Sequence, residues 1–232
     1  MRVKIFLVLM GLLFAFAGKV HADKPAFDPV FPLVGKIAGT PYPYPVDIAR
    51  DPNDVPKQAL PDGAKIVITA HEIEAYISPK GNASKWAGDG SDVKFRYFAF
   101  GGGHPDQDPA PKVPAPFIRV RAGNTITVVL DNTQGKEPHS IDFHSVVGIK
   151  GGASVLVAEP GGTAQTTLTM RNPGTYVYHC AAKGAPFGIA QHMNNGMFGI
   201  VLVEPRNPDH PFNQRAHNAT EFYLFQQDVF LS

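Results

Sequence analysis

The chain is poor in cysteine: Cys180 is the only one among its 232 residues. A single thiol excludes an internal disulfide framework, which small exported domains often use for stability. A lone thiol in an exported chain therefore needs another role, and metal ligation is the obvious one.

Long apolar runs are also missing. The longest, from Ile5 to Ala17, is too short for a comfortable membrane span, so we expect no spanning segment. Residues Met1–Ala22 instead look like a secretory signal peptide. Arg2 and Lys4 give the charged start, and the small-residue end at Ala22 fits a cleavage site. We expect a periplasmic or otherwise exported protein.

Neither sign of charge dominates. The full chain has a formal charge of +1, and without the basic residues of the signal peptide it has a slight acidic excess. This balance gives no reason to expect a nucleic-acid partner. The sequence also lacks a long amphipathic helix, although the GASVLVAEP segment could include a helical turn. Its 23 glycines and 22 prolines favour turns and short strands.

Short strand signals recur from Ala64 onward, as in FIRVRAGNTITVVLDN, where apolar and polar residues alternate before a Gly-Asn turn. Strands of this length between turns predict an all-β, Greek-key β-sandwich. The expected organisation is a signal peptide (1–22), a Pro-rich extended arm (23–63), one β-sandwich domain (64–205), a linker (206–220) and the first strand of a second domain (221–232).

The most informative stretch runs from Tyr176 to Gly199 and reads YVYHCAAKGAPFGIAQHMNNGMFG. It combines the lone Cys180 with His192 and Met197. Thiolate, imidazole and thioether are soft ligands that suit copper, and a blue-copper site takes two histidines, a cysteine and a weak axial methionine. The missing histidine should come from HSIDFH, which begins at His139. The sequence therefore predicts a copper site.

Strand periodicity separates these residues from a second group. Successive side chains of a strand point to opposite faces, so Cys180 and its neighbour His179 cannot face the same metal from a regular strand. In HSIDFH, His144 shares the parity of Asp142 and opposes His139. The first group is then His139, Cys180, His192 and Met197, and the second is Asp142, His144 and His179.

This grouping implies two copper sites joined through the His179–Cys180 bond. In the second group, Asp142 is either a third ligand or an acid that hydrogen-bonds what the metal binds. The acid role is favoured, because an oxyanion that loses an oxygen needs a proton donor.

These motifs resemble copper-containing nitrite reductases. HSIDFH, YHC and the segment NGMFGIVLVEP carry the resemblance, together with IARDPNDVP and PAPFIRVRAGNTI. It runs from about Val46 to the end of the chain and covers the amino-terminal half of the usual two-domain subunit. It implies a cupredoxin-like fold.

The resemblance also implies roles. Nitrite would be reduced to nitric oxide with one electron and two protons, as in denitrification. The electron would come from a small redox protein, a cupredoxin or a cytochrome c, and a full-length subunit would form a homotrimer. Type 1 copper would be held by His139, Cys180, His192 and Met197, and type 2 copper by His144 and His179, with Asp142 as the active-site acid.

Some features depart from the family pattern. The loops from Cys180 to His192 and from Gly101 to Ala115 look expanded, and no residue matches the third type 2 histidine, which the family's second domain provides. A single-domain cupredoxin electron carrier therefore stays an alternative. A multicopper oxidase is a weaker one, because its trinuclear cluster needs His-x-His pairs and the sequence has none. His104, in the second loop, is expected to be solvated.

Overall fold

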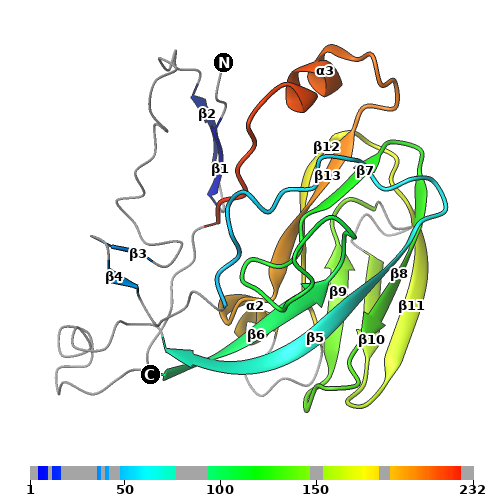
Figure 1. The fold of residues 1–232 in the computed structure, drawn as a ribbon. Coiled ribbons are helices and arrows are strands. Elements are labelled where there is room, and N and C mark those ends of the chain that lie inside the picture. Colours follow the sequence, from blue (N-terminus) through cyan, green and yellow to red (C-terminus); the bar gives the residue numbers. More distant parts are fainter. Residues whose placement is uncertain are drawn as a thin grey trace.

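Two β-sheets packed face to face form the body of the protein in this computed structural model (Figure 1). The structure describes residues 48–76, 94–146, 154–182 and 189–225, together with four short strands nearer the amino terminus. Those four are β1 (Ile5–Leu9), β2 (Leu12–Phe16), β3 (Lys36–Ile37) and β4 (Thr40–Pro41), which pair as β1–β2 and β3–β4.

The five-stranded sheet has the order β10-β9-β12-β13-β7. Its strands are β7 (Ile118–Arg121), β9 (His139–Phe143), β10 (Ser154–Ala158), β12 (Gly174–His179) and β13 (Phe198–Glu204). The four-stranded sheet has the order β11-β8-β5-β6. It comprises β5 (Lys65–Tyr76), β6 (Lys94–Gly102), β8 (Thr125–Asp131) and β11 (Thr163–Thr169). The prediction of an all-β, Greek-key, cupredoxin-like β-sandwich is confirmed.

Side chains from both sheets fill the space between them. Ile68 and Phe98 from one sheet and Ile141 and Tyr178 from the other are fully buried in a single core cluster. The alternation in β8 explains its position, because every second residue is buried and the others face outward. At the expected helical turn, residues 154–158 instead form β10, because Val155 and Val157 pair in register with β9.

Only two helices lie in the described residues, α2 (Ile189–Asn194) and α3 (Pro211–His217). None of the described helices is long and apolar enough to cross a membrane. Helix α2 matters most for function because it precedes the turn into β13 and carries one of the predicted ligands, His192.

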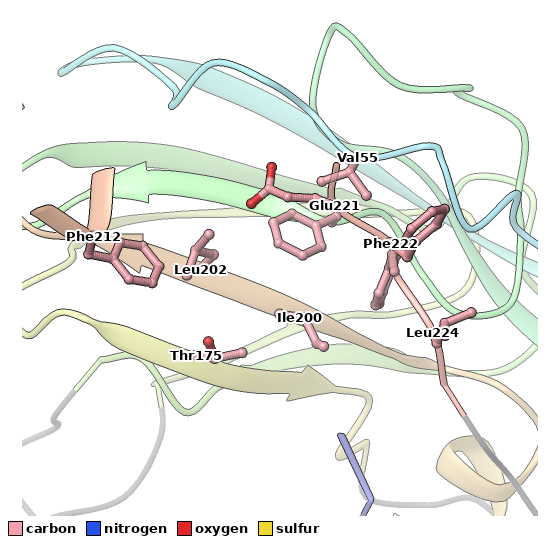
Figure 2. Close-up of a pocket in the computed structure, with 10 residues that line it drawn as sticks. Val55, Thr175, Ile200, Leu202, Phe212, Glu221, Phe222 and Leu224 are labelled. Carbon is pink, nitrogen blue, oxygen red and sulfur yellow. The ribbon is translucent and has the colours of Figure 1, made fainter. Parts of the chain in front are cut away.

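The segment after β13 covers the outer face of the five-stranded sheet. Every residue of β13 is buried, including Ile200 and Leu202 on the side away from the core. Tyr223 packs with Ile200 and Phe117, and Phe225 stacks on Phe198 with ring centroids 3.9 Å apart. Figure 2 shows the resulting apolar pocket between α3 and the 221–224 segment. In the described part of the predicted terminal strand, residues 221–224 form no regular strand.

The described part of the Pro-rich arm, residues 48–63, lies against the sandwich. It forms isolated bridges from Ala49 to Val113 and from Leu60 to Val120. Its Ile48 is buried with Tyr97 and Ala99 of β6. The rest of the arm lies outside the described residues apart from β3 and β4.

Candidate metal centres

Three predicted ligands meet inside one end of the sandwich. One ligand atom each from His139, Cys180 and His192 lies within 4.8 Å of the others, and all three residues are buried. They come from three elements: His139 begins β9, Cys180 follows β12 and His192 lies on α2. His139 and His192 lie 41 and 12 positions from Cys180 in the sequence, yet all three meet in one cluster. We call it the inner cluster.

The register of β9 and β12 explains why His139 and Cys180 face each other. Phe143 pairs with Tyr178, and both point into the core. Alternation places His139 and Cys180 on this same inner side. The Ser140 amide donates to Cys180 Sγ at 3.3 Å, which fixes the sulfur beside β9.

Met197 lies in the turn between α2 and β13, and its side chain is fully buried in the core. Its backbone is bonded to two of the ligand residues. The Met197 amide donates to the His192 carbonyl, and its own carbonyl accepts from the Cys180 amide, both at 3.0 Å. A short loop therefore holds the predicted axial ligand next to the cluster.

The donor atoms of the inner cluster fit a soft metal ion. Neither ring nitrogen of His139 has a hydrogen-bond partner although both are buried. His192 Nδ1 lies 3.2 Å from Cys180 Sγ. Burial raises the pKa of the Cys180 thiol, so a nearby positive charge is needed to hold the thiolate. Two neutral imidazoles, a buried sulfur and a thioether are the donor set that copper prefers.

Acid should destabilise the metal-free protein. Burial and then the neighbouring His192 lower the pKa of His139 from 6.5 to about 4. Between these values the unfolded chain binds more protons than the folded chain, so the free energy of unfolding should fall as pH drops from about 6.5 to about 4. Urea titrations at several pH values across this range measure the free energy of unfolding. A His139→Gln variant should show a shallower dependence, and an equal slope in both proteins would contradict the assignment.

The second predicted group forms a separate cluster on the other side of the same sheet, the outer cluster. One atom each from Asp142, His144 and His179 lies within 4.8 Å of the others. Asp142 and His179 are directly paired across β9 and β12, so their side chains share a face. His144 Nε2 lies 2.9 Å from His179 Nε2.

The tautomer of His179 suits a ligand. His179 Nδ1 lies 2.9 Å from the Cys180 carbonyl oxygen, to which only a protonated nitrogen can donate. Its Nε2 then carries the lone pair that faces His144. Asp142 Oδ1 is buried without a hydrogen-bond partner, so it has capacity for a bound group. Two imidazoles and a carboxylate fit a metal ion that keeps open positions for other ligands.

The two clusters are joined by a single peptide. Cys180 belongs to the inner cluster and His179 to the outer one, as strand alternation predicts. The hydrogen bond from His179 Nδ1 to the Cys180 carbonyl adds a second connection across the same peptide. The structure therefore places all seven predicted site residues in or beside these two clusters.

Sequence reasoning missed the residues that surround the inner cluster. Phe98 of β6 packs against both imidazoles, with ring centroids 4.4 Å from His192 and 5.7 Å from His139. Glu72 and Glu137 approach the far edges of the same rings. Their sequence positions gave no metal-site signal, although Glu137 stands only two residues before His139.

The expectation for His104 was wrong. This residue is buried, and its Nε2 lies 2.9 Å from the Gln58 carbonyl oxygen, to which it donates. Its Nδ1 accepts from the Asp106 amide. The loop folds back on the described part of the arm, and His104 joins the two. Both of its nitrogens have partners in this chain.

The chain is similar in sequence to known copper enzymes. A family model described as multicopper oxidase matches residues 110–208. The copper-containing nitrite reductase of Neisseria meningitidis serogroup A is 37% identical over 139 residues, which is 60% of this chain and 31% of that protein. The same enzyme of Neorhizobium galegae is 33% identical over 122 residues, 51% of this chain and 31% of the relative.

Two solved structures are also similar. A copper nitrite reductase from Nitrosomonas europaea is 27% identical, with a TM-score of 0.45, covering 64% of this chain and 44% of that one. A blue copper oxidase from the same organism is 24% identical, with a TM-score of 0.46, covering 66% and 42%. The chain spans about a third of the length of the curated relatives it matches. Over three fifths of its own length, it is similar to the copper-containing nitrite reductases.

Proposed function

We propose that this chain binds type 1 copper in the inner cluster and type 2 copper in the outer cluster, and takes part in the reduction of nitrite to nitric oxide. One observation carries the proposal: two donor clusters of different chemistry lie on opposite faces of one sheet and share the His179–Cys180 peptide. The name shared by the curated relatives supports the choice of substrate.

The inner cluster is suited to electron transfer. His139, Cys180 and His192 would hold the metal, and the Met197 thioether would be a weaker fourth donor. Their burial excludes water, and their attachment to β9, β12 and α2 keeps the donors in place when the charge changes. Bound copper would supply a one-electron couple here and a Lewis acid for an oxyanion at the outer cluster.

The outer cluster is suited to proton-coupled chemistry. His144 and His179 would hold the metal, and Asp142 lies beside them with an unpartnered, buried Oδ1. The overall reaction takes one nitrite ion, one electron and two protons to nitric oxide and water. Asp142 is placed to hold one of these protons against an oxygen of the substrate, since a carboxyl group at hydrogen-bond distance is an effective general acid.

The expected setting of this chemistry belongs to the same proposal. The charged and apolar start of the chain supports export to the periplasm or beyond. A small donor protein, a cupredoxin or a cytochrome c, would supply the electron. The outer cluster contains two imidazoles among the described residues, which supports completion by a second domain or a neighbouring subunit of a homotrimer.

A cupredoxin-like electron carrier is the second candidate. It is favoured by the inner cluster, whose four predicted ligands all lie in the described part of this chain. Such a carrier would leave the outer cluster without a role. The match to a multicopper oxidase model supports copper as well, but no His-x-His pair is present for a trinuclear cluster.

Copper titration followed by a nitrite assay separates the two candidates. We expect the inner cluster to fill first, because its buried thiolate binds more tightly than two imidazoles. The outer cluster should fill weakly, and nitric oxide should form slowly from nitrite with an artificial electron donor. Metal analysis and electron paramagnetic resonance count the two kinds of copper. A coloured protein that fills only one site and forms no nitric oxide would favour the carrier.

A further inference from the structure

We propose that Glu137 is a positioning residue for the inner cluster, which orients His192 from its far edge and lowers the reduction potential of copper bound there. The inference rests on the proposed copper site. Glu137 lies in the turn between β8 and β9 and reaches a ring whose other edge faces the thiol.

The contacts of His192 determine which of its ring nitrogens carries the proton and which has a lone pair for a metal. Its Nδ1 is 3.2 Å from Cys180 Sγ, and its Nε2 is 3.2 Å from Glu137 Oε2. A carboxylate only accepts hydrogen bonds, so Nε2 must carry the proton and Nδ1 the lone pair. Outer carboxylates of this kind fix the tautomer and orientation of metal-bound histidines and make them better donors.

Glu137 is itself held on both sides. Its Oε1 lies 2.9 Å from Arg96 Nη2, and its backbone amide donates to Glu72 Oε1 at 2.9 Å. The same Arg96 nitrogen lies 2.7 Å from Glu72 Oε2. Glu72 of β5 and Arg96 of β6 thus both bind the turn that carries Glu137. The Glu137 side chain is only 20% exposed. These contacts fix the position of the Glu137 carboxylate beside His192.

A carboxylate also lies near the ring of His139, the second imidazole of the inner cluster. Glu72 Oε1 lies 3.6 Å from His139 Nε2, which is too long for a hydrogen bond. Arg96 stacks over Phe98, which packs on both imidazoles. Glu72, Arg96 and Glu137 therefore form one charged group at the rim of the inner cluster, with two negative charges against one positive.

The net negative charge of this group predicts how substitutions in it should shift the reduction potential of bound copper. A net negative charge beside the site stabilises copper(II) relative to copper(I), and low solvent exposure strengthens the effect. Removing the Glu137 charge should therefore raise the potential, whereas removing the Arg96 charge should lower it. Opposite shifts from two neighbouring substitutions cannot come from a general loss of structure.

The experiment uses the metal-free chain first. In nitrogen-15 NMR, wild-type His192 should be protonated at Nε2, and Glu137→Gln should keep this tautomer because the amide oxygen still accepts. Glu137→Ala should give a mixture of tautomers. Copper is then added. Glu137→Ala should weaken copper binding by about 10- to 100-fold, and Glu137→Gln should raise the midpoint potential while Arg96→Gln lowers it.

A matched control is available before α3, away from these strands. Asp209→Asn removes a carboxylate charge at an exposed position outside the group of Glu72, Arg96 and Glu137. Its tautomer pattern and copper affinity should match those of the wild type. If both Glu137 variants leave the tautomer, affinity and potential unchanged, the inference is wrong. If the wild type itself gives no thiolate band with copper, the proposed copper site has failed instead.

Discussion

Replacing Cys180 with serine should abolish the intense visible absorption of the copper-loaded protein. That absorption requires a thiolate bound to copper(II), and Cys180 is the only thiol in the chain. The substitution removes one sulfur, keeps the size of the side chain and retains a partner for the Ser140 amide. The fold should therefore survive. An optical spectrum of each protein after copper addition and desalting measures the effect.

Met197→Leu is the matched control for this result. Leucine fills the same buried space, so the colour should persist, and the potential should rise because the axial ligand tunes it. The far-ultraviolet circular dichroism of both variants should match the wild type. A copper-loaded Cys180→Ser protein that kept an intense visible band would rule out the inner cluster as a thiolate site.

The sequence predicted the two clusters because strand alternation is a strong geometric constraint. His179 and Cys180 are adjacent, and β12 is regular up to His179, so their side chains separate to opposite faces. The same holds for His139 and Asp142 within β9. Two short motifs in paired strands were enough to separate His139 and Cys180 from Asp142, His144 and His179. His192 and Met197 were assigned instead from the loop that follows Cys180.

The rim of the inner cluster could not be predicted in this way. Glu72 is 65 positions from Glu137, and their meeting depends on how β5 packs beside the turn before β9. In sequence, Glu72 and Arg96 look like ordinary polar residues of alternating strands. Only the three-dimensional packing of the two sheets shows that one of them holds the turn and the other bridges two carboxylates.

The segment after β13 shows a second limit. Its aromatic residues predicted a strand over residues 221–232. Residues 221–224 pack on the outer face of the sheet without regular strand structure, and 226–232 lie outside the described residues. Arg119, on the neighbouring β7, contacts both Glu204 and Glu221, and its side chain is almost fully buried. The ion pair of Arg119, the buried Tyr223 ring and a hydrogen bond from the Tyr223 amide to the Pro52 carbonyl at 2.8 Å hold this segment. Hydrophobic pattern alone does not distinguish this arrangement from a regular strand.

Replacing His144 with alanine should separate the two proposed coppers. Its side chain is exposed on the outer cluster, and its Nε2 lies 2.9 Å from His179 Nε2. The substitution leaves a single imidazole and Asp142, which bind copper far less firmly than two imidazoles with a carboxylate. We expect copper content to fall to the coloured fraction alone and nitric oxide formation to fall to background.

The visible band should be unchanged in this variant, because the inner cluster lies on the opposite face of the sheet and shares no donor with the outer one. His217→Ala, at the exposed end of α3, is the matched control and should behave as the wild type. Metal analysis, the optical spectrum and the nitrite assay are measured on the same samples. If His144→Ala bleached the thiolate band, the division into two clusters would be wrong. If it kept wild-type nitrite reduction, the catalytic metal would have to be held elsewhere, and the adjacent His179 would serve only as a partner for the Cys180 carbonyl.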